Sequence, residues 1–288
     1  HEEGNSPYFD YNTFIQDIHT WVEAYDNIFD NAIYAIPEHK QEAISKRRIG
    51  LGFTGIANAI EYLIGEPSYG SVEFCEYLDK MCNTLKEEAY DASCELAKKR
   101  GAFGLYNSQY GESKFIRTLP DALQAKISEY GIRNSHIISY APCGTISQTA
   151  GNISSGVEPV FHYEQSRDVY MKEGKVNVSL RDYNYREHGF KGKTLSECSV
   201  EDHMRVAKTI QSHCDSSISK TVNVAPGCSY DEYSQIYVKA YNLGLKGITV
   251  YRPTELRGSV IKEAKPVKEN NSYIDMSNLH CANGACTM

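Results

Sequence analysis

A turn rich in small and hydroxyl-bearing residues has the composition and spacing best suited to binding chemistry. Its sequence is Ala141-Pro142-Cys143-Gly144-Thr145-Ile146-Ser147, after a β-rich run at residues 137–140. Pro142 fixes φ and removes a backbone donor, while Gly144 allows close approach to the backbone. Thr145 and Ser147 can cap a helix whose free N–H groups attract an anion. The pattern predicts a phosphate cradle without a lysine, and an ordinary strand–turn–helix connection is the alternative.

Two cysteines near the C-terminus form the second candidate for chemistry. Cys281 and Cys286 flank Ala-Asn-Gly-Ala and follow a polar, unpatterned segment at residues 262–272, which predicts a flexible linker. Such a pair can close a small disulfide ring and exchange with a second disulfide through its thiolate. Zinc binding is disfavoured because no His-Cys partner pair follows, and a tail without function is the other alternative. The residues therefore allow a redox dithiol on a flexible tail, residues 259–288, and we expect no metal site.

Composition narrows the class of protein. The chain has 288 residues, of which 41% are hydrophobic and 23% charged, enough for a substantial core. A net charge of -7 disfavours a nucleic-acid surface, and no apolar run is long enough to span a membrane. Nine cysteines, an odd number without the density of a secreted scaffold, favour a reducing compartment and so a cytoplasmic location. The first residue is not Met, so we expect a fragment, a processed product or an incomplete reading frame.

Hydrophobic periodicity predicts helices that alternate with strands. We expect helices at residues 11–34, 46–64, 70–100, 113–130, 199–213 and 230–243, a hairpin or surface excursion at 162–193, and a buried strand at 246–251. Arg47 and Arg48 would begin the second helix in solvent, outside any site. The glycines after them do not have dinucleotide-binding spacing, so we expect them to allow close helix packing. This alternation is typical of parallel βα units.

Five blocks of the sequence resemble the large, catalytic subunit of ribonucleotide reductases, in the family's order. They are residues 47–57, 99–103, 133–161, 215–223 and 244–252, within a region covering most of 15–260. The resemblance implies that Ala141, Pro142, Gly144, Thr145, Ile146 and Ser147 bind the substrate's phosphates. Ser154, Ser155, Gly156 and Glu158 would lie nearby, with turn and cap chemistry as their alternative role. It also implies that residues 1–258 form the second half of the family's ten-stranded α/β barrel.

The family's mechanism requires residues that this chain lacks. There, a thiyl radical on a loop reading Asn-x-Cys-x-Glu abstracts a ribose hydrogen, and no such loop occurs in this sequence. Because the family places that loop upstream of the block at 11–60, the resemblance implies an N-terminal portion as partner and no activity without it. It also implies a ribonucleotide substrate, a thioredoxin or glutaredoxin type reductant for Cys281 and Cys286, and a dimer of complete catalytic chains.

Tyr251 bears on the source of the radical. Family members that depend on a small radical subunit carry two adjacent tyrosines at this strand, whereas Tyr251 stands alone. The difference favours the adenosylcobalamin-dependent branch (class II), although the tail spacing also resembles small-subunit-dependent (class I) members. Tyr251 as a packed strand aromatic is the alternative. Three functions stay open: a reductase portion, a non-catalytic docking or regulatory module, and a small thiol-exchange protein. The sequence does not distinguish diphosphate from triphosphate substrates.

Overall fold

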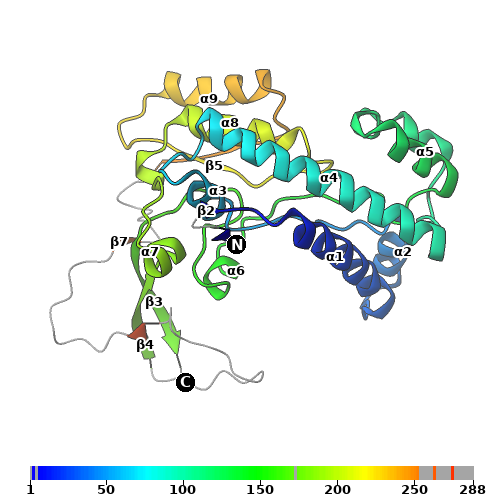
Figure 1. The fold of residues 1–288 in the computed structure, drawn as a ribbon, viewed down its shortest axis with the longest axis horizontal. Coiled ribbons are helices and arrows are strands. Elements are labelled where there is room, and N and C mark those ends of the chain that lie inside the picture. Colours follow the sequence, from blue (N-terminus) through cyan, green and yellow to red (C-terminus); the bar gives the residue numbers. More distant parts are fainter. Residues whose placement is uncertain (1, 4–5, 172–173, 253–261, 264–273, 276–288) are drawn as a thin grey trace.

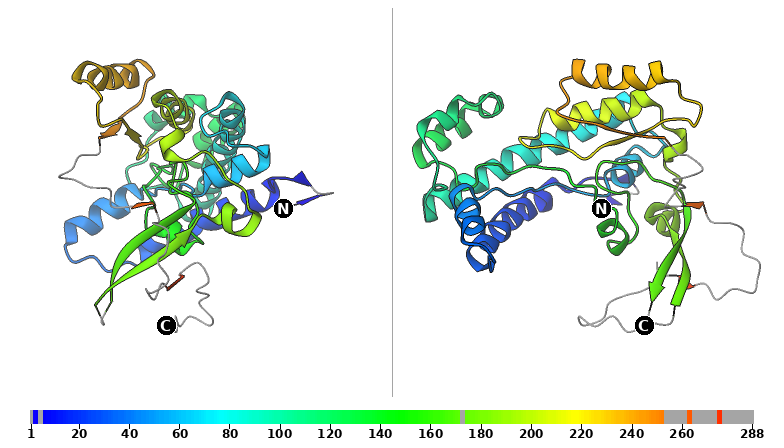
Figure 2. Two further views of the ribbon diagram at one scale, coloured as in Figure 1. Left: turned by 90° about the vertical axis from the view of Figure 1, so that its left-hand side faces the viewer. Right: turned by 180° about the vertical axis from the view of Figure 1, so that it is seen from behind.

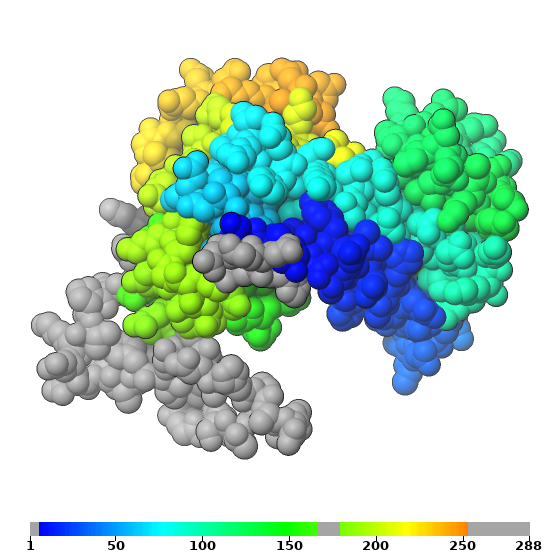
Figure 3. Space-filling model, viewed as in Figure 1, coloured from blue at the N-terminus to red at the C-terminus, as the bar shows by residue number. Residues whose placement is uncertain are grey.

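A 29-residue helix, α4 (Val72–Arg100), forms the centre of the fold. The computed structural model describes residues 2–3, 6–171, 174–252, 262–263 and 274–275. Ser71 caps α4 by accepting from Phe74 N, and basic residues fill its last turn, where they favour the helix dipole. The helix packs against α1, α3, α5 and α8. Figure 3 shows α4 (cyan) running between α1 (dark blue) and the α8–α9 region (yellow to orange).

Most of the predicted helices are confirmed, with shorter bounds in places. The helices are α1 (Tyr11–Asn31), α2 (Pro37–Lys46), α3 (Ile56–Ile64), α5 (Asp121–Tyr130), α6 (Ile146–Thr149), α7 (Tyr183–His188), α8 (Val200–Gln211) and α9 (Tyr230–Asn242), with short 3-10 turns at Ser108–Glu112, Ile116–Thr118 and Leu195–Glu197. Ser199 and Ser229 form capping boxes at the starts of α8 and α9. The helix predicted at 113–130 begins only at Asp121, after Pro120.

Four short extended segments, widely separated in the sequence, lie side by side and parallel. Strand β5 (Thr221–Asn223) pairs with β6 (Thr249–Tyr251), and parallel bridges join Leu51 to Ile138 and Tyr140 to Ile218. These contacts confirm parallel pairing of segments separated by helices. The described residues are mostly helical, with small sheets and no closed barrel. The predicted second half of a ten-stranded barrel is therefore represented in the described residues only by these short parallel segments. Strand β6 is also shorter and more exposed than the buried strand predicted at 246–251.

The helix predicted at residues 46–64 is wrong in its first half. The chain leaves α2 at Arg47 with φ +45° and is not helical again until α3 begins at Ile56. A Cβ on Gly52 would lie 2.5 Å from the carbonyl oxygen of Ser139. The glycines do allow close packing, as expected, but of one extended segment on another. Glycine lowers helix propensity, which the periodicity argument did not weigh.

A hairpin projects from the helical body. Strands β3 (Glu164–Met171) and β4 (Gly174–Arg181) pair antiparallel, confirming the hairpin predicted at 162–193. Figures 1 and 2 show it extending away from the helices. Two pieces of the predicted tail lie along its edges, β7 (Lys262–Glu263) beside β3 and β8 (Ile274–Asp275) beside β4. Near the N-terminus, β1 (Glu2–Glu3) pairs with β2 (Ser6–Pro7).

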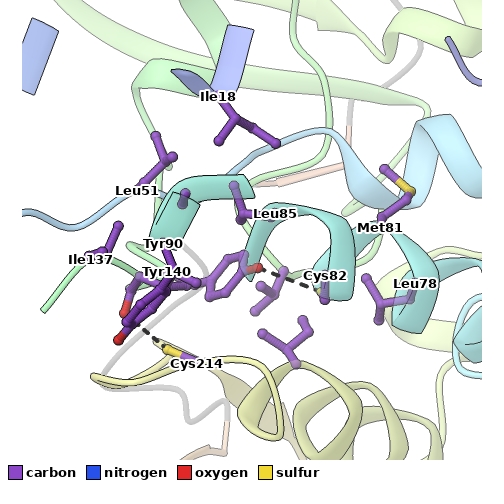
Figure 4. Packing of buried hydrophobic residues seen from close by; sticks show 14 of the residues in the cluster. Ile18, Leu51, Leu78, Met81, Cys82, Leu85, Tyr90, Ile137, Tyr140 and Cys214 are labelled. Carbon is purple, nitrogen blue, oxygen red and sulfur yellow. Dashed lines mark hydrogen bonds between the residues drawn. The ribbon is translucent and has the colours of Figure 1, made fainter. Parts of the chain in front are cut away.

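The main hydrophobic core lies between α4 and the parallel segments. Leu78, Cys82 and Leu85 of α4 are buried against residues of the neighbouring segments. Figure 4 shows the Tyr140 hydroxyl directed at the Cys82 sulfur, to which it donates over 3.6 Å. Burial raises the pKa of Cys82 to about 12, so this thiol stays protonated. It serves as a packing residue, as predicted for the helical cysteines.

Arg47 is not the solvent-exposed residue that the sequence predicted. Its guanidinium is buried, donating from Nε to Asp26 Oδ1 at 2.7 Å and from Nη1 to Asp30 Oδ1 at 3.0 Å. Arg100 and Arg133 reach the other Asp26 oxygen at 3.3 and 3.1 Å. The cluster joins α1, the end of α4 and the loop after α2. A buried arginine needs such partners, which come from positions distant in sequence.

None of the helices in the described part of the chain combines the length and the apolar character needed to cross a bilayer.

Candidate functional site

A cavity of about 380 Å³ lies beside the predicted phosphate turn. Of the predicted site residues, Pro142, Gly144, Ser147, Ser154, Ser155, Glu158 and Tyr251 line it. Ala141, Thr145, Ile146 and Gly156 do not line it. Further lining comes from the hairpin base and from β5, including Gln165, Asp182 and Thr221. Folding thus brings most of the predicted residues to one cavity, although they span more than a hundred positions in sequence.

The turn has a different local structure from the predicted helix start. Helix α6 has only four residues, and Thr145 at its N-cap makes no side-chain cap bond. Ser147 is buried, and its hydroxyl lies 2.8 Å from the Ser155 hydroxyl and 3.2 Å from the Gly144 carbonyl, to which it donates. Cys143 adopts φ +54°, a left-handed conformation that turns the chain sharply. The predicted capping by Thr145 is therefore wrong, and Ser147 instead ties the turn to the segment at 154–156.

Hydrogen bonds from the start of α3 hold the far side of the turn. Thr54 Oγ1 donates to the Ser154 carbonyl at 2.7 Å and accepts from Gly156 N at 2.8 Å. Asn58 Oδ1 accepts from Ser154 N at 2.6 Å, and its amide donates to Asp182 at 2.9 Å. Ser154 Oγ accepts from Ala57 N in the first turn of α3 and so satisfies a free helix donor. The cavity wall is therefore anchored before any ligand arrives.

Gly156 lies against the backbone of the turn. It has φ +52°, and a Cβ there would lie 2.6 Å from the Ala141 carbonyl oxygen. A larger residue would push the two segments apart, so Gly156 acts in packing rather than as a cavity-lining residue. Gly144 differs, because a Cβ there would meet open space within this chain. Of these two glycines, only Gly144 leaves its backbone open to the approach of a bound group.

Glu158 pairs with a lysine behind the cavity wall. Lys220 Nζ donates to Glu158 Oε2, to His203 Nδ1 at 2.8 Å and to the Thr221 carbonyl at 3.1 Å. Glu158 Oε1 accepts from Thr221 N at 2.8 Å. Burial, followed by the charge of Lys220, lowers the pKa of His203 to about 3, so His203 is neutral. Sequence reasoning missed Lys220 as a site residue, although it lies in the block at 215–223 that carries the family resemblance.

A larger cavity of about 1350 Å³ adjoins the first. The two share His162, Leu195, Asn223 and Tyr251, so Tyr251 lies where they meet. Its lining is mostly apolar and includes Val200, Val224 and Ile236, from α8, the end of β5 and α9. The wall also carries charged side chains, among them Glu201, Asp231, Glu232 and Lys239. A large cavity with both apolar and polar lining suits a large ligand of mixed character.

Two further predictions concern a metal site and the thiols of the tail. The described residues contain no group of three or more His, Cys, Asp or Glu side chains placed to hold a metal ion. Cys281 and Cys286 lie outside the described residues. Their role as a thiol shuttle stays a prediction.

The chain resembles known proteins over most of its length. The family model described as "Ribonucleotide reductase, barrel domain" matches residues 2–251. A vitamin B12-dependent ribonucleoside-diphosphate reductase of Mycobacterium tuberculosis is 30% identical over 268 residues, covering 84% of this chain and 36% of that protein. A protein of the same name from Thermoplasma acidophilum is 27% identical, covering 84% of this chain and 33% of its own length. A ribonucleoside-diphosphate reductase subunit alpha of Treponema pallidum is 22% identical, covering 82% and 28%.

The match to a barrel domain agrees with the parallel pairing of the extended segments. The chain spans about a third of the length of these relatives. On the family match over residues 2–251, this chain belongs to the ribonucleotide reductase family and corresponds to its barrel domain.

Proposed function

We propose that this chain is the part of a ribonucleotide reductase catalytic chain that binds the phosphates of the substrate and carries the thiol shuttle. The observation that carries the proposal is the cavity in which Gly144, Ser147, Ser154 and Ser155 converge beside the turn. The activity would convert ribonucleotides to 2′-deoxyribonucleotides. The radical cysteine would come from an upstream portion, because the chain spans about a third of its relatives and contains no Asn-x-Cys-x-Glu sequence.

The phosphate assignment follows from the groups that the cavity offers. Backbone N–H groups in a sharp turn and serine hydroxyls donate hydrogen bonds, and they bind anions without a positively charged side chain. The open approach above Gly144 lets an oxygen reach the backbone. Bonds from Thr54 and Asn58 fix the opposite wall, so little ordering is required when a ligand binds.

The cofactor proposal rests on the relatives, on Tyr251 and on the larger cavity. The relatives from Mycobacterium tuberculosis and Thermoplasma acidophilum are named vitamin B12-dependent. We infer that adenosylcobalamin, when bound, supplies the radical, and that the apolar lining around Val200, Val224 and Ile236 would hold it. In this chain, Tyr251 lines both that cavity and the phosphate cavity, where the two meet.

The proposal also covers the electron donor, the oligomeric state and the alternative source of the radical. Cys281 and Cys286 would re-reduce the active site after each turnover, using a thioredoxin or glutaredoxin type protein as electron donor. The paired catalytic chains of the family would make the complete enzyme a dimer. In the small-subunit-dependent alternative, a separate protein would supply the radical. A docking or regulatory module would need neither the cavity nor the tail dithiol.

A reconstitution experiment tests the proposed activity. The 288-residue chain is mixed with an upstream portion that contains Asn-x-Cys-x-Glu, together with adenosylcobalamin, a ribonucleoside diphosphate and a small dithiol. We expect deoxyribonucleotide only in the mixture, measured by chromatography, and none from either chain alone. The triphosphate is tested in parallel. A folded mixed complex that stays inactive with cobalamin and with a small radical subunit would favour the docking module.

Gly144→Ala should weaken phosphate binding without changing stability. The added methyl group meets open space, so the free energy of unfolding should change by no more than about 0.5 kcal/mol. Because the methyl blocks the approach to the backbone, affinity for inorganic pyrophosphate should fall roughly tenfold or more. Isothermal titration calorimetry and thermal unfolding measure the two effects. Gly111→Ala is the matched control, since its Cβ also meets open space but lies far from the cavity, in the turn Ser108–Glu112. Equal affinities for both variants would contradict the assignment.

A further inference from the structure

The smaller cavity is unusual for a phosphate site in the charges of its wall. None of the described residues that line it is Lys or Arg, whereas two are carboxylates, Glu158 and Asp182. A phosphate group would be repelled by an uncompensated carboxylate at this range, because a cavity screens charges less than water does. The proposed function therefore requires something that cancels the negative charge of the wall.

Asp182 has neutral partners that hold it in place. It accepts both bonds from the Asn58 amide, at 2.9 and 3.1 Å, and it caps α7 by accepting from Tyr185 N at 3.2 Å. The positive end of the helix dipole reduces the effect of its charge. Among the described residues, no cationic side chain pairs with Asp182, so the counter-charge for the wall must be found at Glu158.

Glu158 contacts a cation that the cavity itself does not expose. The Lys220 side chain is 0% exposed, while that of Glu158 is 12% exposed and faces the cavity. Nζ has three acceptors, Glu158 Oε2, His203 Nδ1 and the Thr221 carbonyl, which match the three N–H donors of an ammonium group. Burial lowers the pKa of Lys220, and the adjacent Glu158 carboxylate opposes that effect. The three acceptors favour the charged form.

Among the described residues, Glu158 is the only charged group that contacts Lys220. His203 is neutral and contributes only a lone pair, and the Tyr69 ring lies 5.8 Å from Nζ. Tyr69 donates its hydroxyl to the Val157 carbonyl at 2.6 Å, next to Glu158 in sequence. The ammonium group is therefore directed at one carboxylate, and that carboxylate belongs to the cavity wall.

We propose that Lys220 is a positioning residue of the phosphate cavity, which holds Glu158 in the wall and cancels its charge so that the phosphate groups of a nucleotide can enter. This role rests on the proposed function. It predicts that the wall attracts anions less when Lys220 is removed and more when Glu158 is neutralised. A purely structural link between residue 158 and β5 predicts the opposite for Glu158, because breaking either side of the pair would then weaken binding.

Three variants of the 288-residue chain test this role: Lys220→Met, Glu158→Gln and the double variant. We expect Lys220→Met to bind inorganic pyrophosphate about thirtyfold more weakly than wild type, the effect of one unit charge roughly 8 Å away at an effective dielectric constant of about 20. The double variant should regain most of the lost affinity, and Glu158→Gln alone should bind at least as tightly as wild type. Titration calorimetry at two salt concentrations gives the affinities, and circular dichroism checks folding.

The outcomes separate this role from the proposed function. If wild type binds pyrophosphate but Glu158→Gln binds it clearly less well, Lys220 acts only structurally and the proposal is overturned. That result stands even if Lys220→Met does not fold, because circular dichroism checks the folding of Glu158→Gln separately. If the folded wild type and Glu158→Gln both fail to bind pyrophosphate, the phosphate assignment itself is wrong, and this role for Lys220 fails with it.

Discussion

Asp26→Asn is expected to lower the free energy of unfolding by about 3–5 kcal/mol, because it leaves a buried guanidinium without its buried counter-charge. Asp26 is 0% exposed and contacts three arginines. Arg47, itself buried, cannot turn to water to recover its hydration. The expected measurement is a lower urea midpoint with an unchanged slope, since the surface exposed on unfolding stays the same.

Asp30→Asn is the matched control for this prediction. Asp30 also pairs with Arg47, at 3.0 Å, but its side chain is 50% exposed. Water screens an exposed pair, so its loss should cost no more than about 1 kcal/mol. Equal losses for the two variants would mean that the arginines, rather than the buried carboxylate, determine the stability of the cluster. The Asp26 variant should keep its pyrophosphate affinity when folded, because the cluster contributes nothing to the lining of either cavity.

Replacing both Cys281 and Cys286 by serine should abolish turnover with a thioredoxin-type reductant in the reconstituted enzyme, while a small dithiol continues to support it. A tethered dithiol meets the active site at a high effective concentration, so its loss should slow turnover roughly a hundredfold or more. A small dithiol diffuses to the active-site disulfide directly and does not need the tail. The measurement is the rate of deoxyribonucleotide formation with each reductant.

Cys228→Ser provides the control for the tail variant. Cys228 is a free, half-buried thiol that lines the larger cavity. Its replacement should leave the ratio of the two rates, with protein reductant and with small dithiol, unchanged. If the tail variant instead works equally well with both reductants, the shuttle role of Cys281 and Cys286 is wrong.

The parts of the fold that could be predicted from sequence are those fixed by near neighbours. Ser199 and Ser229 cap α8 and α9 through acidic residues three positions later, a local bond that any structure with these helices would form. The periodicity of residues 70–100 likewise predicted α4. The error at residues 46–56 has the same origin, because the extended conformation there depends on pairing with residues 136–140, about ninety positions away.

The candidate site also contains some residues that could be predicted from the sequence and others that could not. Gly144 and Ser147 were predicted because a turn composition is local and because it matches a family segment. Lys220, Asn58 and Thr54 were not predicted as site residues, since each acts through a partner from a distant segment. Arg47 was predicted in solvent for the same reason. The sequence does not show which carboxylate will pair with the arginine and so allow it to be buried.

By itself, the sequence determined the helices with local caps, the turn that contains Gly144 and the family to which the chain belongs. Only the tertiary structure decided which charges are buried together and which walls enclose the cavity. The physical reason is range: caps and turns form between residues a few positions apart, whereas the ion pair of Glu158 and Lys220 joins residues 62 positions apart. Such a pair is stable only where folding removes both groups from water and satisfies every remaining donor.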